Sequence, residues 1–246
     1  MCGFAGFTGH LDNSEEVLTN MMNRIIHRGP DSAGQHIDNG AALGFRRLSI
    51  IDLDCGSQPM YNETNDIVIT FNGEIYNYQD LRKELIEKGH TFRNNSDTEV
   101  LIHAYEEYGE DMLNRLRGMF AWDFFGIKPF YYALVDGNLV FASEIKSILE
   151  YPLYQKAVNN VALENYLTFQ YSVLDETFFK GIYKLMPSHC LTFHKGELNI
   201  KRYWEPVFEP DENKTLEECV DEIDKVMHDS VEHHKISDVE VGSFLS

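Results

Sequence analysis

The chain contains few cysteines and few basic residues, and each of these features argues against certain classes of protein. Only four of its 246 residues are cysteine, and no two form a C-x-x-C pair. This scatter suits a reducing compartment better than a disulfide scaffold. Lysine and arginine number 21 against 40 acidic residues, which gives a net charge of −19. That balance argues against nucleic acid or an anionic membrane as the main partner.

Long apolar runs are also missing. No stretch approaches the ~18 residues of a membrane-spanning helix, and no basic segment followed by an apolar one opens the chain. Hydrophobic residues nevertheless make up 43% of the sequence, enough to bury a full core. The length allows one large domain, or one domain plus a fragment of another. These features together predict a soluble cytoplasmic protein.

The periodicity of apolar residues predicts a mixture of helices and strands without regular βαβ alternation, which is an α+β arrangement. Gly, Pro and Asn-Gly or Asp-Gly pairs separate the elements. The helices are expected at residues 14–26, 78–88, 96–108 and 160–169. The strands are expected at residues 3–7, 40–51, 66–71, 130–135, 139–142, 190–194 and 197–203, with the last four paired as two hairpins.

The last forty residues differ in character from the rest. Residues 206–214 carry two of the seven prolines and several acidic residues, which is typical of a linker. Residues 215–234 predict one amphipathic helix, and residues 239–246 predict a strand. One helix and one strand are too little for a domain, so residues 215–246 are expected to open a second, incomplete one.

Cys2 directly follows the initiator methionine. If Met1 is removed, one residue carries both a thiol and a free α-amine, whose pKa of about 7.7–8.0 lets it act as the base for its own side chain. Cysteine is the better nucleophile among the residues known to work in this way. A small, inert, buried cysteine is the alternative, and position alone favours it.

An ordered set of motifs gives the chain a resemblance to the glutamine-hydrolysing asparagine synthetases. It resembles their N-terminal glutaminase domain, one of the N-terminal-nucleophile amidotransferases, over most of the first ~200 residues. Each motif is weak alone, and the order is specific: Met1-Cys2-Gly3, His27-Arg28-Gly29-Pro30-Asp31, Arg47-Leu48-Ser49-Ile50-Ile51-Asp52, Gln58-Pro59-Met60, Asn72-Gly73-Glu74-Ile75-Tyr76-Asn77, Ser96-Asp97-Thr98-Glu99, Phe125-Gly126-Ile127-Lys128-Pro129 and Ala142-Ser143-Glu144-Ile145-Lys146. The resemblance implies a four-layer αββα sandwich over residues 2–205.

The resemblance implies a catalytic centre made of Cys2, Asn72 and Gly73. Cys2 attacks the side-chain amide of glutamine and forms a thioester as ammonia leaves. The attack creates an oxyanion, to which Asn72 can offer its side-chain amide and Gly73 its backbone N–H. Taken alone, Asn72-Gly73 is more simply an ordinary turn.

The two charged ends of glutamine need anchors of their own. Arg47 resembles the family's carboxylate anchor, since a guanidinium binds a carboxylate through two hydrogen bonds, while Arg46 is the solvated alternative. Main-chain groups of Leu48, Ser49, Ile50 and Ile51 are expected at the same end. Asp97 and Glu74 resemble the partners of the ammonium. Asp97 as a simple helix cap is the alternative, and the two roles can coexist.

The remaining segments suggest supporting roles. The loop with His27, Arg28 and Asp31 is expected to support the site rather than act directly. Leu245 resembles a residue that lines a nucleotide pocket, although this chain stops before the phosphate-binding loop that follows in the family. The pair His233-His234 and the Cys190 to His194 stretch lack a full ligand set, so no metal site is predicted.

The resemblance also implies what the intact enzyme uses. No cofactor is expected in this chain, whereas ATP and Mg²⁺ are expected in the intact enzyme, which transfers ammonia to aspartate. Glutamine is the expected ligand here, and nucleic acid and membranes are not. A homodimer is one assembly that the resemblance allows. The alternatives are another amidotransferase of this nucleophile class, in amino-sugar or purine synthesis, and a catalytically silent regulatory or interaction domain.

Two local departures from the family stand out. Only Trp122-Asp123-Phe124 separate Gly118-Met119-Phe120-Ala121 from Phe125-Gly126-Ile127-Lys128-Pro129, where family members carry a further strand, turn and strand. The absence of a core hairpin would expose sheet edges, so residues omitted from the chain are the preferred explanation. Leu185-Met186-Pro187-Ser188-His189 replaces the usual Pro-Pro-Gly-His turn, which affects only the local loop.

Overall fold

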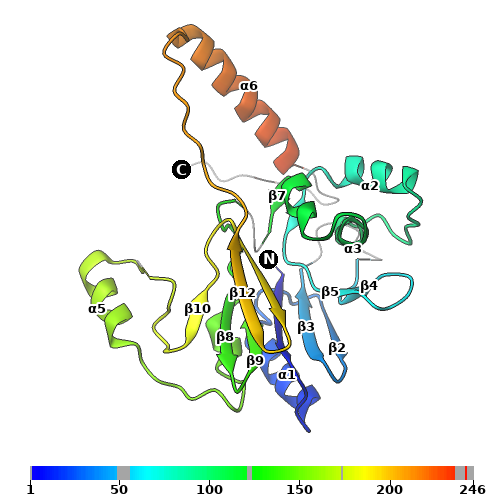
Figure 1. Cartoon of the computed structure of the whole chain (residues 1–246), viewed down its shortest axis with the longest axis vertical. Helices are drawn as coiled ribbons and strands as arrows, with labels where there is room; N and C mark the ends of the chain where they lie inside the picture. Colours follow the sequence, from blue (N-terminus) through cyan, green and yellow to red (C-terminus); the bar gives the residue numbers. More distant parts are fainter. Residues whose placement is uncertain (1, 49–55, 121–123, 173, 236–241, 243–246) are drawn as a thin grey trace.

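The computed structural model of the chain describes residues 2–48, 56–120, 124–172, 174–235 and 242. Its centre is a six-stranded antiparallel sheet in the order β10-β8-β9-β1-β3-β2 (Figure 1). The strands are β1 (Gly3–Thr8), β2 (Ser32–Ile37), β3 (Ala41–Arg47), β8 (Tyr131–Val135), β9 (Asn138–Ala142) and β10 (Ile182–Lys184). The first strand of the chain is therefore an inner strand, paired with β9 on one side and β3 on the other.

A second layer lies against this sheet in three separate pieces. These are the two-stranded ladders β4 (Met60–Tyr61) with β5 (Val68–Ile69), β6 (Glu74–Ile75) with β7 (Gly118–Met119), and β11 (His189–His194) with β12 (Glu197–Arg202). The expected α+β sandwich is confirmed, but the described part of its second sheet is not continuous. The ladder β11–β12 crosses in front of β8 and β9 in Figure 1.

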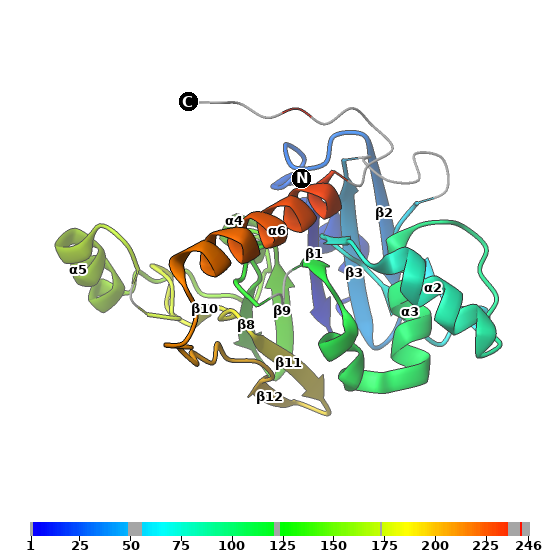
Figure 2. The same cartoon turned by 90° about the horizontal axis from the view of Figure 1, so that it is seen from above.

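Helices cover the outer faces. The helices are α1 (Ser14–Asn23), α2 (Tyr78–Glu87), α3 (Asp97–Tyr108), α4 (Ile145–Ile148), α5 (Asn160–Phe169) and α6 (Leu216–His234), and the 3₁₀ turn η1 is Gly109–Arg115. The helices α1 and α4 pack on the six-stranded sheet, while α3 packs on β4 and β5. In Figure 2, α2 and α3 lie next to each other at one side of the molecule and α5 lies at the other. The layers are thus helix, sheet, ladders and helix, as the αββα prediction requires.

Alternation along β1 explains the layering. Ala5 and Phe7 point to one face and join a buried cluster with Leu18 and Met21 of α1. Phe4 points to the opposite face and packs with Leu191 of β11. A third cluster joins α2, α3 and the ladder strand β6. Because β1 has apolar side chains on both faces, it is buried between two layers.

Most of the expected elements form, but the helix expected at 14–26 ends at Asn23, and the sheet strands β2 and β10 were not predicted. One expected strand is also much shorter. The segment 66–71 forms a strand only at Val68–Ile69. The side chain of Gln58 pairs with both backbone groups of Phe71, accepting from its N–H at 2.5 Å and donating to its carbonyl oxygen at 3.2 Å. This side chain takes the place of a neighbouring strand and ends the ladder there.

The C-terminal helix α6 forms as expected and begins with a complete capping box of Thr215 and Glu218. None of its residues is buried, and it projects from the body of the molecule (Figure 1). Its last turns touch the body through an ion pair of Asp229 with Arg117 and a ring contact of His234 with Tyr76. No helix in the described ranges combines the length and the apolarity needed to cross a membrane.

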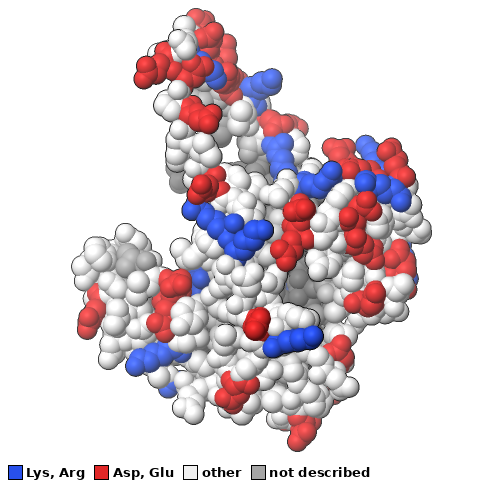
Figure 3. Space-filling view, viewed as in Figure 1, with Lys and Arg blue, Asp and Glu red and all other residues white. Residues whose placement is uncertain are grey.

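Acidic side chains gather on α6 and over the face formed by α2 and α3 (Figure 3). Residues 205–214 are without regular structure and mostly exposed, as a linker would be. The division of the chain into domains stays a prediction, and the expected strand at 239–246 lies outside the described residues apart from Gly242.

Candidate functional site

Cys2 lies immediately before the inner strand β1, where the surrounding strands fix its position. Two residues later, the Phe4 N–H donates to the Ser143 hydroxyl at 3.0 Å, and the Ser143 N–H donates to the Phe4 carbonyl oxygen at 2.9 Å. The Cys2 thiol faces the end of β3: the Leu48 N–H donates to its Sγ at 3.3 Å, and the Leu48 carbonyl oxygen lies 3.4 Å away. Backbone pairing therefore positions the thiol within the fold.

A small pocket of about 50 Å³ opens beside the thiol. Six of the predicted site residues line it together, and they are Cys2, Arg47, Leu48, Gly73, Glu74 and Asp97. They come from four separate segments of the chain, so their convergence is a result of the fold and not of sequence proximity. The predicted residues Ser49, Ile50, Ile51 and Leu245 lie outside the described residues.

Burial raises the pKa of the Cys2 thiol above its ordinary value. The Leu48 N–H and the charges of Arg47 and Lys128 act in the opposite direction without overcoming burial. A buried thiol of this kind is mostly protonated near neutral pH, so it needs a base before it can act as a nucleophile.

The two adjacent arginines of β3 point in different directions, as alternation along a strand requires. Arg47 is 7% exposed and lines the pocket. Arg46 turns to α1, where it donates to Asn23 Oδ1 at 2.7 Å and to the Met22 carbonyl oxygen at 3.4 Å. Arg47 lines the pocket and Arg46 does not, and the role of Arg47 as a carboxylate anchor stays a prediction.

Asp97 is the first residue of α3 and is buried beneath the pocket. Ser96 caps the helix, accepting from the Glu99 N–H at 3.3 Å, so Asp97 is not the cap. Its Oδ2 instead accepts from the Ile75 N–H at 3.0 Å. Burial, together with the nearby charge of Glu74, raises the pKa of Asp97 to about 6 despite this hydrogen bond.

Glu74 lies at the start of β6, one residue from the Asp97 hydrogen bond. Burial raises its pKa, and the charges of Lys128 and His234 partly oppose that shift. Two carboxyl groups that both resist ionisation thus share one pocket. Each would be stabilised in its ionised form by a cation placed between them.

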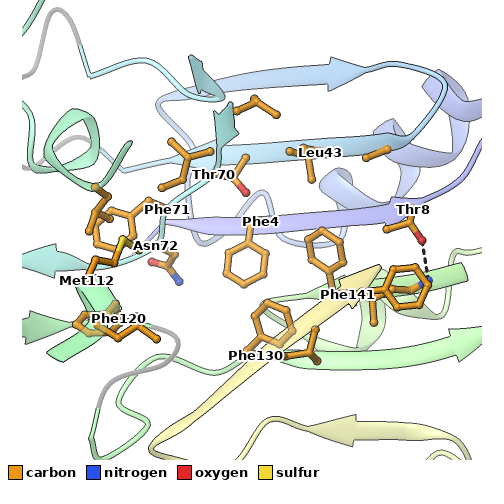
Figure 4. Close-up of a pocket in the computed structure, with 18 of the residues that line it drawn as sticks. Phe4, Thr8, Leu43, Thr70, Phe71, Asn72, Met112, Phe120, Phe130 and Phe141 are labelled. Atoms are coloured by element: carbon orange, nitrogen blue, oxygen red, sulfur yellow. Dashed lines mark hydrogen bonds between the residues drawn. The ribbon is translucent and has the colours of Figure 1, made fainter. Parts of the chain in front are cut away.

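Asn72 and Gly73 are neighbours in the chain but line different cavities. Gly73 lines the small pocket and has no space for a side chain, since an added Cβ would lie 2.4 Å from the Met119 carbonyl oxygen. Asn72 is 4% exposed, and its Nδ2 has no hydrogen-bond partner among the described residues. Its side chain lines a different space, a large apolar hollow behind Phe4 (Figure 4).

This hollow has a volume of about 390 Å³ and lies between the six-stranded sheet and the broken second layer. Phe4, Phe130 and Phe141 point into it from the sheet side, and the Asn72 amide lies beside Phe120 (Figure 4). Val68 to Phe71 border it on one side and Leu191 and Phe193 of β11 on another. It therefore occupies the gap between two ladders of the second layer.

The loop after α1 holds the backbone of Cys2 in place, in the supporting position that the sequence predicts. Arg28 donates through Nε to the Cys2 carbonyl oxygen at 3.0 Å and through Nη1 to Glu144 at 3.2 Å. Glu144 also binds His27 at 2.9 Å and Lys146 at 2.9 Å. The Asp31 N–H donates to the Arg47 carbonyl oxygen at 3.1 Å. One loop thus steadies the backbone of both Cys2 and Arg47.

Several pocket residues were not assigned from the sequence. Gln58, Ser96 and Thr98 line the pocket, and Gln58 donates to Thr98 Oγ1 at 3.2 Å as well as holding Phe71. Lys128 is 8% exposed and close enough to Cys2 and Glu74 for its charge to affect both. All four belong to the motifs on which the family resemblance rests, and this membership could have marked them as site residues.

Comparisons with known proteins agree with this geometry. The family model of the glutamine amidotransferase domain matches residues 1–204. Asparagine synthetase [glutamine-hydrolyzing] 1 of Bacillus subtilis is 40% identical over 266 aligned positions, covering 100% of this chain and 42% of the relative. Asparagine synthetase [glutamine-hydrolyzing] 2 of Arabidopsis thaliana is 41% identical over 166 positions, covering 60% of this chain and 28% of the relative.

This chain spans less than half the length of these curated relatives. Among solved structures, the allosteric regulatory enzyme of purine biosynthesis matches with a TM-score of 0.61 at 18% identity, over 84% of this chain and 50% of that one. The glutamine phosphoribosylpyrophosphate amidotransferase of Bacillus subtilis matches with a TM-score of 0.59, also at 18% identity, with the same coverage. At that identity the likeness concerns the fold.

Proposed function

Since this chain belongs to the glutamine amidotransferase domain family, we propose that it hydrolyses glutamine to glutamate and ammonia through Cys2. The observation that carries the proposal is the single pocket in which the Cys2 thiol, Arg47 and Asp97 meet. Arg47 suits the α-carboxylate of glutamine, and the pair Asp97 and Glu74 suits its α-ammonium. The side-chain amide of the ligand then lies toward the thiol.

The proposed reaction starts once Met1 has been removed. The free α-amine of Cys2 takes the thiol proton, and the thiolate attacks the amide carbon of glutamine. The Gly73 N–H stabilises the resulting oxyanion. In the proposal the unpaired Asn72 Nδ2 is the second donor, for which its side chain must turn from the apolar hollow toward Cys2. The protonated α-amine of Cys2 then gives its proton to the amide nitrogen, the carbon–nitrogen bond breaks, and ammonia leaves. Water hydrolyses the resulting thioester to glutamate and restores the thiol.

We further propose that the whole protein is a glutamine-hydrolysing asparagine synthetase. The support is the name of relatives that are 35–40% identical over the full length of this chain. In that proposal ammonia passes to aspartate, with ATP and Mg²⁺ bound by a part of the protein outside this chain. Residues 2–205 form the glutaminase, residues 206–214 the linker and residues 215–246 the start of the ATP-binding domain, where Leu245 contributes to the nucleotide pocket. The protein works in the cytoplasm, where a catalytic thiol stays reduced.

The alternatives have less support. An amidotransferase of amino-sugar or purine synthesis shares the fold, but the relatives similar over this whole chain carry the asparagine synthetase name. A silent regulatory domain would have no need to keep the thiol, the arginine and both carboxylates in one pocket. A homodimer remains a proposal for the whole protein.

The decisive experiment compares two cysteines of the same chain. Cys2→Ala should abolish glutamine hydrolysis, whereas Cys190→Ala, a buried cysteine in a different cluster, should retain it. Circular dichroism should show that both variants fold. Mass spectrometry of the active protein should find Cys2 as the first residue. Glutaminase activity in the Cys2→Ala protein, or full activity with Met1 retained, would contradict the proposal.

A further inference from the structure

A second cluster of chemically active side chains lies away from the Cys2 pocket, on α3 and on the turn after α2. It consists of His90, His103 and Glu106, each of which offers one ligand atom, and these atoms lie within 4.8 Å of one another. His103 and Glu106 are one turn apart on α3. The sequence-based search for metal sites considered other histidines and did not include these.

The turn after α2 brings His90 to this place. Gly89 has a φ of +105°, in the region that only glycine adopts without strain, and lets the chain reverse. The His90 N–H then donates back to the Leu85 carbonyl oxygen at 3.0 Å. The imidazole of His90 lies against that of His103, with 5.1 Å between the ring centroids. The cluster therefore joins the end of α2 to the middle of α3.

The inner nitrogens of both rings converge on one oxygen. His103 Nδ1 lies 2.7 Å and His90 Nδ1 lies 3.4 Å from Glu106 Oε2. The other oxygen of Glu106 accepts from Asn62 Nδ2 at 2.8 Å. That hydrogen bond fixes the carboxylate and leaves Oε2 facing the two rings.

The outer nitrogens of both rings face carboxylates. His90 Nε2 lies 3.4 Å from Glu107, and His103 Nε2 lies 3.8 Å from Glu63 and 4.0 Å from Glu99. His90 Nε2 is within hydrogen-bond distance of Glu107, whereas the His103 Nε2 contacts are too long for hydrogen bonds. His103 Nδ1–H donates to Glu106 Oε2 when no ion is bound. A divalent ion would displace that proton and bind the lone pairs of both inner nitrogens and of Glu106 Oε2.

We propose that His90, His103 and Glu106 form a binding site for a first-row divalent metal ion, with Zn²⁺ as the best-fitting ion. Two imidazoles and one carboxylate are a familiar Zn²⁺ ligand set, with water as the fourth ligand. Bonds of about 2.0–2.1 Å in a tetrahedron place neighbouring ligand atoms about 3.3 Å apart. The His90 to Glu106 spacing already matches, and the His103 to Glu106 spacing must open by a few tenths of an ångström.

The surroundings support a cation and an entry route. Glu107 accepts a hydrogen bond from the outer nitrogen of His90, a partner of the kind that orients histidine ligands in metal sites. Of the negative groups involved, Glu107 is also paired with Lys88, at 2.8 Å. His103 is buried, whereas Glu106 is exposed, so one side of the cluster is open to water and ions.

The role of the ion is structural. Nine residues separate Glu106 from Asp97, which places the cluster about 13 Å along α3 from the pocket. The ion cannot contact glutamine from there. It would tie α2 to α3 and so stabilise the helix whose first residue lines the pocket.

The test measures Zn²⁺ binding to the full chain after dialysis against a chelator. A Cys2→Ser background removes the thiol that could itself bind zinc. Calorimetry should find one Zn²⁺ per chain, and Co²⁺ in its place should give the absorption spectrum of a tetrahedral site. Mg²⁺ should not compete, because imidazole is a poor ligand for it.

Three variants decide where the ion lies. His90→Gln and Glu106→Gln should each weaken Zn²⁺ binding by more than tenfold and abolish the zinc-dependent rise in melting temperature. Glu107→Ala removes only an orienting partner and should weaken binding by about tenfold. The control is His233→Gln, a histidine of α6 outside the cluster, which should bind as the background does. His90 is only half-buried, so its variant is expected to fold even if variants of His103 do not.

The outcomes separate cleanly. Loss in the His90 and Glu106 variants with retention in the His233 variant supports the site. A change below tenfold in either cluster variant, a loss in the control, or no zinc binding by the background protein overturns it. None of these results depends on glutaminase activity, so the metal site and the proposed function can fail separately.

Discussion

The molecule contains two hollows on either side of the segment 71–73, and they are built on opposite principles. The pocket beside Cys2 measures about 50 Å³ and is lined by charged and hydrogen-bonding groups. The hollow behind Phe4 measures about 390 Å³ and is almost entirely apolar. Phe71 borders both. In the first, almost every polar group has a fixed partner, while in the second a single amide, that of Asn72, is left without one among the described residues.

The two cavities differ in how firmly their lining residues are held. Around the thiol, Leu48, Gln58 and Asp97 are each held by backbone hydrogen bonds, so the pocket is set before any ligand arrives. Behind Phe4, aromatic rings face empty space and lose the contacts that a filled core would give them. The apolar hollow is therefore the weak region of the protein, and the polar pocket is the ordered one.

The largest effect is expected from filling the hollow. The alignment with the Bacillus subtilis relative runs over 266 positions, 20 more than the 246 residues of this chain. We expect the missing positions at Trp122-Asp123-Phe124, and inserting the corresponding segment of the relative there should supply strands between β5 and β11. At about 24 cal/mol per Å³, the ceiling of the gain in unfolding free energy is ~9 kcal/mol.

Urea denaturation of the two chains measures this gain, for which several kcal/mol are expected. A Gly-Ser insert of equal length is the control, because it adds residues without apolar side chains. If the control stabilises the chain as much as the relative's segment does, the hollow is not the weak region.

The second prediction concerns Asn72, whose replacement should raise stability and lower activity. Asn72→Leu removes a buried unpaired donor and adds apolar volume to the hollow, so stability should rise by about 1–3 kcal/mol. The same change removes the proposed oxyanion donor, so kcat for glutamine should fall by about 10²–10³-fold. Thr70→Val, on the same wall, should leave kcat unchanged. A variant that gains stability and keeps full kcat would exclude Asn72 from catalysis.

A third prediction concerns the polar pocket alone. Arg47→Ala removes the proposed carboxylate anchor and should raise the KM for glutamine by about 100-fold, the equivalent of two charge-assisted hydrogen bonds. Arg46→Ala is the matched control, since that side chain binds α1 instead. Steady-state kinetics of both variants checks this. Equal KM values would move the anchor away from Arg47.

The smallest effect expected is on pH dependence. As pH falls, glutamine binding should weaken while the free energy of unfolding should increase. Glutamine needs ionised Asp97, whose pKa is about 6, so KM should rise up to tenfold between pH 6 and pH 5. Folding raises this pKa above its ordinary value of 3.8. The folded chain therefore holds the proton more tightly, and its stability should rise as pH falls through 6 toward 4.

Kinetics and urea denaturation at several pH values measure the two slopes. In Asp97→Asn both should diminish, and what remains should come from Glu74, whose pKa is also raised by burial. If glutamine binding and the free energy of unfolding both strengthened, or both weakened, as pH falls in the unaltered chain, a group other than Asp97 would control one of them.

The sequence predicts local structure well and distant pairing poorly. The helix of residues 97–108 begins where Ser96 caps it, and the helix of residues 215–234 begins at a capping box, because both signals lie within four residues. The six converging pocket residues were identified through a resemblance carried by motifs. Gln58 in place of a strand, and His90 beside His103, depend on contacts across 13 or more residues that no local pattern encodes.

The placement of β1 has a consequence for motion. The ends of protein chains usually fray, and their amides exchange with solvent within the shortest times. Here the residues that follow Cys2 pair on both sides, and Ala5 and Phe7 are almost fully buried. Hydrogen exchange should therefore be slowest within the first ten residues of the chain. Cys2, the proposed nucleophile, therefore stands next to a strand that is paired on both sides and buried between two layers.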